Sequence, residues 1–129
     1  MLFSIDEKDS RPFYLQLANQ VKEQVSSGML KPGDVLPSVR ELAESLHINL
    51  HTVRSAYLKL RDEGVIDLRL GRKARITHRP SGVSTGDVSE ELVRKIRELV
   101  ADALVQGLSP EDIRYLINEQ LAKMARGGD

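Results

Sequence analysis

Residues 36–66 read LPSVRELAESLHINLHTVRSAYLKLRDEGVI and contain the boundary signals of two consecutive helices. Residues 38–41 (Ser-Val-Arg-Glu) have the form of a capping box, in which the serine caps a free amide of the first turn and the glutamate caps the serine amide. Apolar residues then recur at helical spacing as far as Leu46. After a short turn, Asn49 can cap a second helix, and Gly64 marks its end. We therefore expect two helices joined by a tight turn.

The segments on either side extend this helix pair into a larger domain. Upstream, apolar residues recur at helical spacing from Tyr14 to Val25, and Gly28 marks the end of this first helix. Downstream, residues 65–70 and 74–77 alternate apolar and polar side chains, which predicts a β-hairpin. Three helices followed by a hairpin form a winged helix-turn-helix. The expected fold class is mostly α with a small β wing.

Residues 88–129 predict a C-terminal hairpin of two helices. The first helix ends at Gly107, and the second begins at Ser109, which caps it and is followed by Pro110 and two acidic residues. Two short helices cannot bury both of their apolar stripes alone, so we expect a second copy of the chain to cover them in a homodimer. The expected dimerisation residues are Leu92, Ile96, Leu99 and Ala103 on the first helix and Ile113, Ile117, Leu121 and Met124 on the second.

The charge distribution changes sign between these two parts of the chain. The net charge is zero, but residues 1–80 hold 13 Lys+Arg against 10 Asp+Glu, while residues 81–129 hold 6 against 9. The change falls in a segment rich in Pro, Gly and Ser, which is typical of a linker. We therefore expect a DNA-binding domain over residues 1–79, a linker over 80–87 and a helical dimerisation region over 88–129.

The composition excludes several classes of site. Cysteine is absent, which excludes disulfides, thiolate metal sites and cysteine nucleophiles. His47 and His51 are four residues apart, but a predicted turn separates them and no third ligand is apparent, so no metal site is expected. No phosphate-binding glycine loop or catalytic constellation is visible, so we expect neither an enzyme nor a cofactor. Early charges and the lack of a long apolar run favour a cytoplasmic protein with no membrane partner.

The helix pair and the wing together match what double-stranded DNA requires of a binding protein. A helix-turn-helix presents the N-terminal residues of its second helix to base edges in the major groove, and cations bind the phosphates. Residues 68–79 hold five Lys+Arg and no acid. The expected DNA-binding residues are Ser38, Arg40, Asn49, His51, Thr52, Arg54, Gly71, Arg72 and Lys73.

Four ordered motifs resemble the GntR family of transcription regulators. They are the glycine-bounded loop of residues 28–33, LPSVRELA at 36–43, TVRSAYLKL at 52–60 and EGVI at 63–66. The short C-terminal part resembles the YtrA-type subgroup. The resemblance implies a dimeric repressor that binds a palindromic operator through the residues at the positions of Arg40, Asn49, Thr52, Arg54 and Gly71.

Two positions depart from the family pattern. Position 50, often Arg or Pro in relatives, is Leu50 here, and a second wing glycine is replaced by Lys73. The operator sequence of relatives therefore does not transfer to this chain. Leu50 is able either to contact a thymine methyl group or to pack against the protein.

Other functions are less consistent with these residues than DNA binding is. A winged helix can act as a protein-interaction module, but such a module has no need of cations on every DNA-facing element. A fragment of a larger sensor, or of a pyridoxal-dependent fusion, is disfavoured by the regular C-terminal hairpin. About 40 residues of helix leave little room for the roughly 300 Å³ of a small-molecule site, so an effector stays unassigned.

Overall fold

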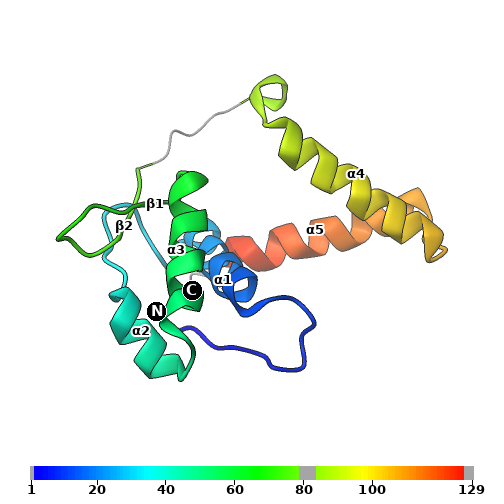
Figure 1. Cartoon of the computed structure of the whole chain (residues 1–129). Helices are drawn as coiled ribbons and strands as arrows, with labels where there is room; N and C mark the ends of the chain where they lie inside the picture. Colours follow the sequence, from blue (N-terminus) through cyan, green and yellow to red (C-terminus); the bar gives the residue numbers. More distant parts are fainter. Residues whose placement is uncertain (1, 79–83, 127–129) are drawn as a thin grey trace. The chain divides into compact units, whose positions relative to one another are not determined.

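The computed structural model describes residues 2–78 and 84–126. The described elements group into two compact units, one built on residues 1–79, to which 124–129 are also assigned, and one of residues 80–123. The predicted class is confirmed: helices dominate, with a small two-stranded wing and two further helices towards the C-terminus (Figure 1). The elements are α1 (Phe13–Ser27), α2 (Val39–Leu46), α3 (Leu50–Asp62), β1 (Ile66–Asp67), β2 (Arg75–Ile76), a 3₁₀ turn (Thr85–Asp87), α4 (Glu90–Val105) and α5 (Pro110–Arg126).

The predicted boundaries of the first three helices are confirmed by their caps. At the end of α1, Gly28 has a left-handed φ of 85°, and its amide donates to the carbonyl oxygen of Val25. At the start of α2, Ser38 Oγ accepts the Glu41 amide hydrogen at 3.0 Å, which forms the predicted capping box. At the start of α3, Asn49 Oδ1 accepts the amide hydrogen of His51 at 2.7 Å. Each cap supplies a partner for backbone groups that the helix itself leaves unpaired.

In the first unit, α1 and α2 both pack against α3. Their buried faces follow the helical periodicity of the sequence, and Tyr57, predicted as a core residue, is 1% exposed. The strands add their inward side chains to the same core. The largest fully buried side chains are Tyr57, Leu17, Leu36, Leu60, Ile66, Val21 and Val53.

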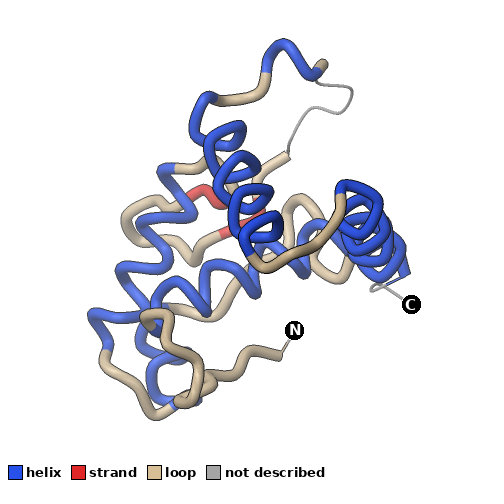
Figure 2. The backbone as a smooth tube through the Cα atoms, turned by 90° about the vertical axis from the view of Figure 1, so that its right-hand side faces the viewer, coloured by secondary structure: helices blue, strands red, loops and turns tan. Residues whose placement is uncertain are grey.

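The wing is shorter in strand than predicted (Figure 2). Strands were expected over residues 65–70 and 74–77, but β1 and β2 have two residues each, with Ile66 opposite Ile76. The expectation was wrong in length: the ladder stops at Asp67 and Arg75, and beyond it the chain turns where the Arg72 amide donates to the carbonyl oxygen of Arg69 at 3.1 Å. Leu70 is fully exposed, so its place in the alternation does not reflect burial. The loop of residues 68–74 projects from the three helices (Figure 1).

The second unit contains α4 and most of α5, which are joined by a turn in which Gly107 has a φ of 98°. The predicted cap of α5 is confirmed, because Ser109 Oγ accepts the amide hydrogen of Asp112 at 3.1 Å. The helices diverge from this turn (Figure 1), and of their described side chains Ile113 alone is buried. The predicted linker contains the 3₁₀ turn, while residues 80–83 lie outside the described ranges. The domain limits 1–79, 80–87 and 88–129 stay a prediction.

Candidate nucleic-acid interface

The turn between α2 and α3 sets the direction of α3. His47 adopts the left-handed conformation, with a φ of 55°, and the Ile48 amide donates to the carbonyl oxygen of Ala43 at 3.1 Å. The chain therefore reverses within a few residues and begins α3 at Asn49. In the described ranges, no cluster of His, Cys, Asp or Glu is arranged to hold a metal ion, and His47 acts as a helix C-cap.

One face of α3 is buried and the opposite face is exposed. Its buried residues are Val53, Ala56, Tyr57 and Leu60. Most of its predicted DNA-binding residues lie on the other face: His51 and Arg54 are exposed, as are Leu50 and Ser55, while Thr52 is half-buried. The face that holds α3 in the core thus leaves the predicted base-reading side chains accessible.

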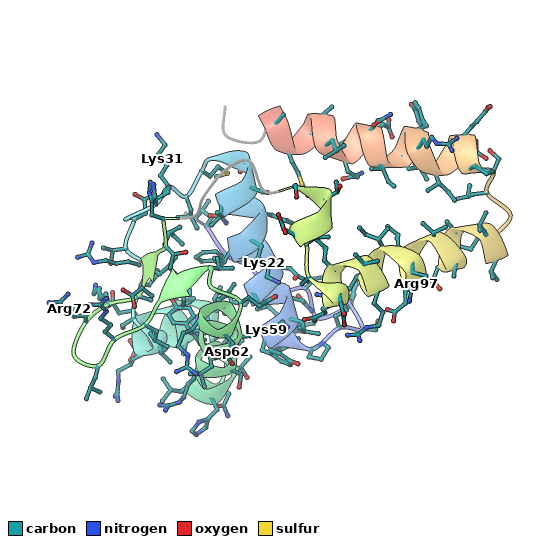
Figure 3. All side chains as sticks on the ribbon, turned by 90° about the horizontal axis from the view of Figure 1, so that it is seen from above. Lys22, Lys31, Lys59, Asp62, Arg72 and Arg97 are labelled. Atoms are coloured by element: carbon teal, nitrogen blue, oxygen red, sulfur yellow. The ribbon has the colours of Figure 1, made fainter. Side chains whose placement is uncertain are left out.

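Three predicted DNA-binding arginines are exposed and have no partner among the described residues. They are Arg40 on α2, Arg54 on α3 and Arg72 in the wing loop, where Figure 3 shows it away from α1 and α3. Most other cations of this unit are paired with carboxylates. The pairs are Arg11–Asp9, Arg61–Asp62, Arg69–Asp67, Lys73–Glu41 and, at the α1–α3 contact, Lys22–Glu63 and Lys59–Glu63.

Residues 36–38 connect the three elements that carry these arginines. The Leu36 amide donates to Ala74 at the wing base at 2.8 Å, and Ser38 caps α2. The Tyr57 hydroxyl of α3 donates to the carbonyl oxygen of Pro37 at 2.6 Å. Burial, and secondly the charge of Glu41, raises the pKa of Tyr57, so this hydroxyl stays a donor in basic solution as well as at neutral pH. One short segment therefore positions the wing, α2 and α3 together.

Glu41 is a member of the site that the sequence pattern identified only as a helix cap. Its Oε1 lies 3.1 Å from Lys73 Nζ in the wing. Hydrogen bonding to Lys73, and secondly to Ser38, holds the pKa of Glu41 below its ordinary value. No sequence signal indicated this pair, because Glu41 and Lys73 are far apart in the chain. The predicted DNA-binding residue Lys73 is therefore paired within the protein.

The start of α1 also borders the start of α3, which the sequence analysis did not identify. A surface hollow of about 390 Å³ lies between these two helix ends. Pro12, at the N-cap of α1, was the sequence signal for where that helix begins, because proline is common at helix starts. The hollow is lined by Pro12, Phe13 and Tyr14 from α1 and by Asn49, His51, Thr52 and Ser55 from α3.

The predicted dimerisation residues are largely exposed within the single chain. Leu99 is 55% exposed and Leu121 is 61% exposed. Of the eight residues, Ala103 is half-buried and Ile113 is buried, with 9% of its surface exposed. The other exposed members of the set are Leu92, Ile96, Ile117 and Met124.

Comparisons with known proteins agree with this architecture. The family model described as "Bacterial regulatory proteins, gntR family" matches residues 13–76. The HTH-type transcriptional repressor YtrA of Bacillus subtilis is 34% identical over 126 residues, which cover 98% of this chain and 97% of that protein. No helix in the described part of the chain is long and apolar enough to span a membrane.

Solved structures extend the similarity to the whole fold. A transcriptional antiterminator from Listeria monocytogenes EGD-e has a TM-score of 0.88 at 31% identity, covering 100% of this chain and 96% of its own. YtrA from Sulfolobus acidocaldarius, a GntR-family transcription factor, has a TM-score of 0.64 at 34% identity, covering 81% and 99%. The chain belongs to the gntR family of bacterial regulatory proteins and is a DNA-binding helix-turn-helix transcription regulator, not an enzyme.

Proposed function

We propose that this chain is a repressor that binds a palindromic double-stranded DNA operator as a homodimer. The observation that carries the proposal is the set of three exposed arginines on α2, α3 and the wing that have no partner among the described residues. Residues 36–38 connect the elements that carry them. The repressive direction is supported by the similarity to the Bacillus subtilis repressor along nearly the whole chain. Cations on every DNA-facing element disfavour a pure protein-interaction module.

In this proposal the exposed N-terminal half of α3 lies in the major groove. Arg54 and Arg40 each have a guanidinium with no partner in the described ranges, and it can donate two hydrogen bonds to guanine O6 and N7. Asn49 Oδ1 is occupied by the His51 amide, so the Asn49 amide group retains its donors for a base or a phosphate. Thr52 and His51 supply further polar contacts from the same end of the helix.

The caps and the wing supply the contacts that position the protein on the backbone. Ser38 Oγ accepts within the capping box, and its hydroxyl hydrogen is free to donate to a phosphate. Gly71 has a φ of 79° and no side chain, so the wing backbone can approach DNA closely. Arg72 beside it adds a positive charge that phosphates or the minor groove attract.

The exposed stripes of α4 and α5 support the dimer. Apolar side chains that a single chain leaves in water gain free energy when a second copy covers them, and a two-fold arrangement uses the same stripes twice. A dimer of this kind presents two copies of α3 to half-sites about 34–36 Å apart, one helical turn of DNA. Operator symmetry then follows from protein symmetry.

The experiment is a selection of bound sequences from random duplex DNA with the full chain. We expect enrichment of an inverted repeat with half-sites about one helical turn apart. The variant with both Arg40→Ala and Arg54→Ala is the control and should not enrich that repeat. Placing the repeat over a reporter promoter should lower expression when the chain is present. Failure to enrich any sequence, or enrichment of a single unpaired half-site, would contradict the proposal.

A further inference from the structure

One ion pair joins the wing to α2. Lys73 Nζ lies 3.1 Å from Glu41 Oε1, and the same carboxylate accepts the Ser38 amide hydrogen at 3.4 Å. The neighbouring Arg72 guanidinium forms no ion pair or hydrogen bond with any residue that the structure describes. In the protein without DNA, Lys73 is therefore paired with a carboxylate, whereas the adjacent Arg72 has no described partner.

We propose that Lys73 is a positioning residue that holds the wing against α2 through Glu41, and that Arg72 supplies the wing's charge to the DNA phosphates. This inference rests on the proposed placement of the wing on DNA. It assigns different roles to two residues that the basic character of the loop does not distinguish.

The backbone of the wing shows why a tether is needed. The ladder between β1 and β2 covers two residue pairs, and beyond it the loop of residues 68–74 has a turn in which the Arg72 amide donates to Arg69 at 3.1 Å. Ala74 is buried and bonded to Leu36, so Lys73 is the residue at which the loop leaves the protein body. A side-chain contact from Lys73 therefore limits the movement of residues 68–72 of the loop.

Competition between the Glu41 carboxylate and a DNA phosphate for Lys73 is the second reason to assign Lys73 as the tether. A phosphate at the Lys73 ammonium has to compete with the Glu41 carboxylate, whose negative charge already offsets that of Lys73 and which also caps α2. The Arg72 guanidinium has no carboxylate to displace among the described residues, and its planar group can bind a phosphate with two hydrogen bonds. The chemistry thus favours Arg72 as the phosphate contact and Lys73 as the tether.

The test is a double-mutant cycle on the full chain with Glu41→Gln, Lys73→Gln and the double variant, and with Arg72→Gln as the matched control. Glutamine at position 41 is compatible with a capping box, so α2 keeps its start. Affinity for the selected operator is measured by fluorescence anisotropy over a range of KCl concentrations. The salt slope counts the phosphate contacts, and the cycle measures the coupling of the pair.

We expect Arg72→Gln to reduce the slope of log Kd against log salt by about one per protomer, because a phosphate contact is lost. Lys73→Gln should leave the slope unchanged and weaken binding about two- to fivefold, in keeping with an exposed ion pair. In the Glu41→Gln background the tether is already absent, so Lys73→Gln should weaken binding by less than it does in the wild type. The proposal would be overturned by a reduced salt slope in Lys73→Gln or by an unchanged slope in Arg72→Gln. It would also be overturned if Lys73→Gln weakened binding as much in the Glu41→Gln background as in the wild type.

A measurement without DNA separates this inference from the proposed function. Amide hydrogen exchange in residues 68–73 should rise in Glu41→Gln and in Lys73→Gln and stay at the wild-type level in Arg72→Gln. Equal exchange in all four proteins would overturn the tether even if the operator is bound. Absence of operator binding, with exchange raised as expected, would contradict the proposed function and leave the tether supported.

Discussion

Six of the twelve lysines and arginines in residues 2–78 are held in ion pairs, whereas the three arginines of the predicted DNA-binding set have no described partner. Arg61 on α3 pairs with Asp62, whereas Arg54 on the same helix has no described partner. A paired guanidinium has to leave its carboxylate before it binds DNA. The free state of Arg40 and Arg54 therefore makes them suited to bidentate binding of guanine.

Replacing either of these arginines should reduce sequence discrimination. We expect Arg40→Ala and Arg54→Ala each to weaken operator binding by roughly 1–3 kcal/mol, with a smaller effect on random DNA, because a base contact is lost. Arg61→Ala, on the same helix but paired, is the control and should change operator binding little. Titrations of operator and random duplexes at one salt concentration measure the difference. Equal losses on both duplexes would rule out base reading by these residues.

Glu41 should contribute to stability in a pH-dependent way. Its folded-state pKa is lowered below the ordinary value of 4.5, so its contribution is present above that pH and is lost as the pH falls through the folded-state pKa. Urea denaturation of the wild type and Glu41→Gln should therefore show a difference at pH 7 that shrinks towards pH 3. A constant difference for Glu41→Gln would contradict the lowered pKa.

At the scale of elements, the caps and turns determine where each helix begins and ends. Gly64 has a φ of 76° and turns the chain from α3 into the wing, where the Val65 amide donates to Leu60 at 2.8 Å. A methyl group at Gly64 would meet no atom within 4 Å. Any cost of a side chain at this position is therefore a cost of backbone conformation.

Substitutions at Gly64 should follow the left-handed preference of the new residue. We expect Gly64→Ala to lower the free energy of unfolding by about 1–2 kcal/mol, because the left-handed region is strained for alanine. Gly64→Asn should lose less, because asparagine adopts this conformation more readily. Urea denaturation monitored by circular dichroism compares the two variants. Equal losses would mean that the backbone conformation does not control the effect.

At the scale of the molecule, the exposed stripes of α4 and α5 should control the oligomeric state. Ile96 lies in the α4 stripe, and Ala101 is an exposed residue of α4 outside the predicted stripe. We expect Ile96→Glu to be monomeric at micromolar concentration, because burying a carboxylate in the dimer interface with no opposite charge beside it is costly. Ala101→Glu adds the same charge and should stay dimeric. Sedimentation equilibrium measures both, and a dimeric Ile96→Glu would exclude this face.

The N-terminal domain should fold without the C-terminal helices. A chain of residues 1–79 keeps the whole core cluster of the first unit, so we expect a folded monomer. It should bind an isolated half-site weakly, because the linkage that makes the second contact intramolecular is lost. Thermal denaturation and sedimentation of this chain test both points. A truncated chain that still dimerises would place the dimer interface outside residues 88–129.

Local bonding determined the parts of this protein that its sequence alone predicts. The caps at Ser38, Asn49 and Ser109 join residues three or fewer positions apart, so the order of residue types is enough to encode them. The buried faces of α1 and α3 follow helical periodicity for the same reason. The family motifs add the role of the exposed face of α3, because they occur in a fixed order and spacing.

Tertiary structure decided the contacts between residues that are distant in the chain. The Tyr57 hydroxyl meets Pro37, and Lys73 meets Glu41, only because α3 and the wing pack beside residues 36–38. Residues 33–36 bond to the outer edge of the second wing strand through Ile76 and Ala74, which alternation within the wing cannot reveal. Sequence spacing records which residues share one face of an element. Only packing of several elements decides which of those faces, and which charges, come together.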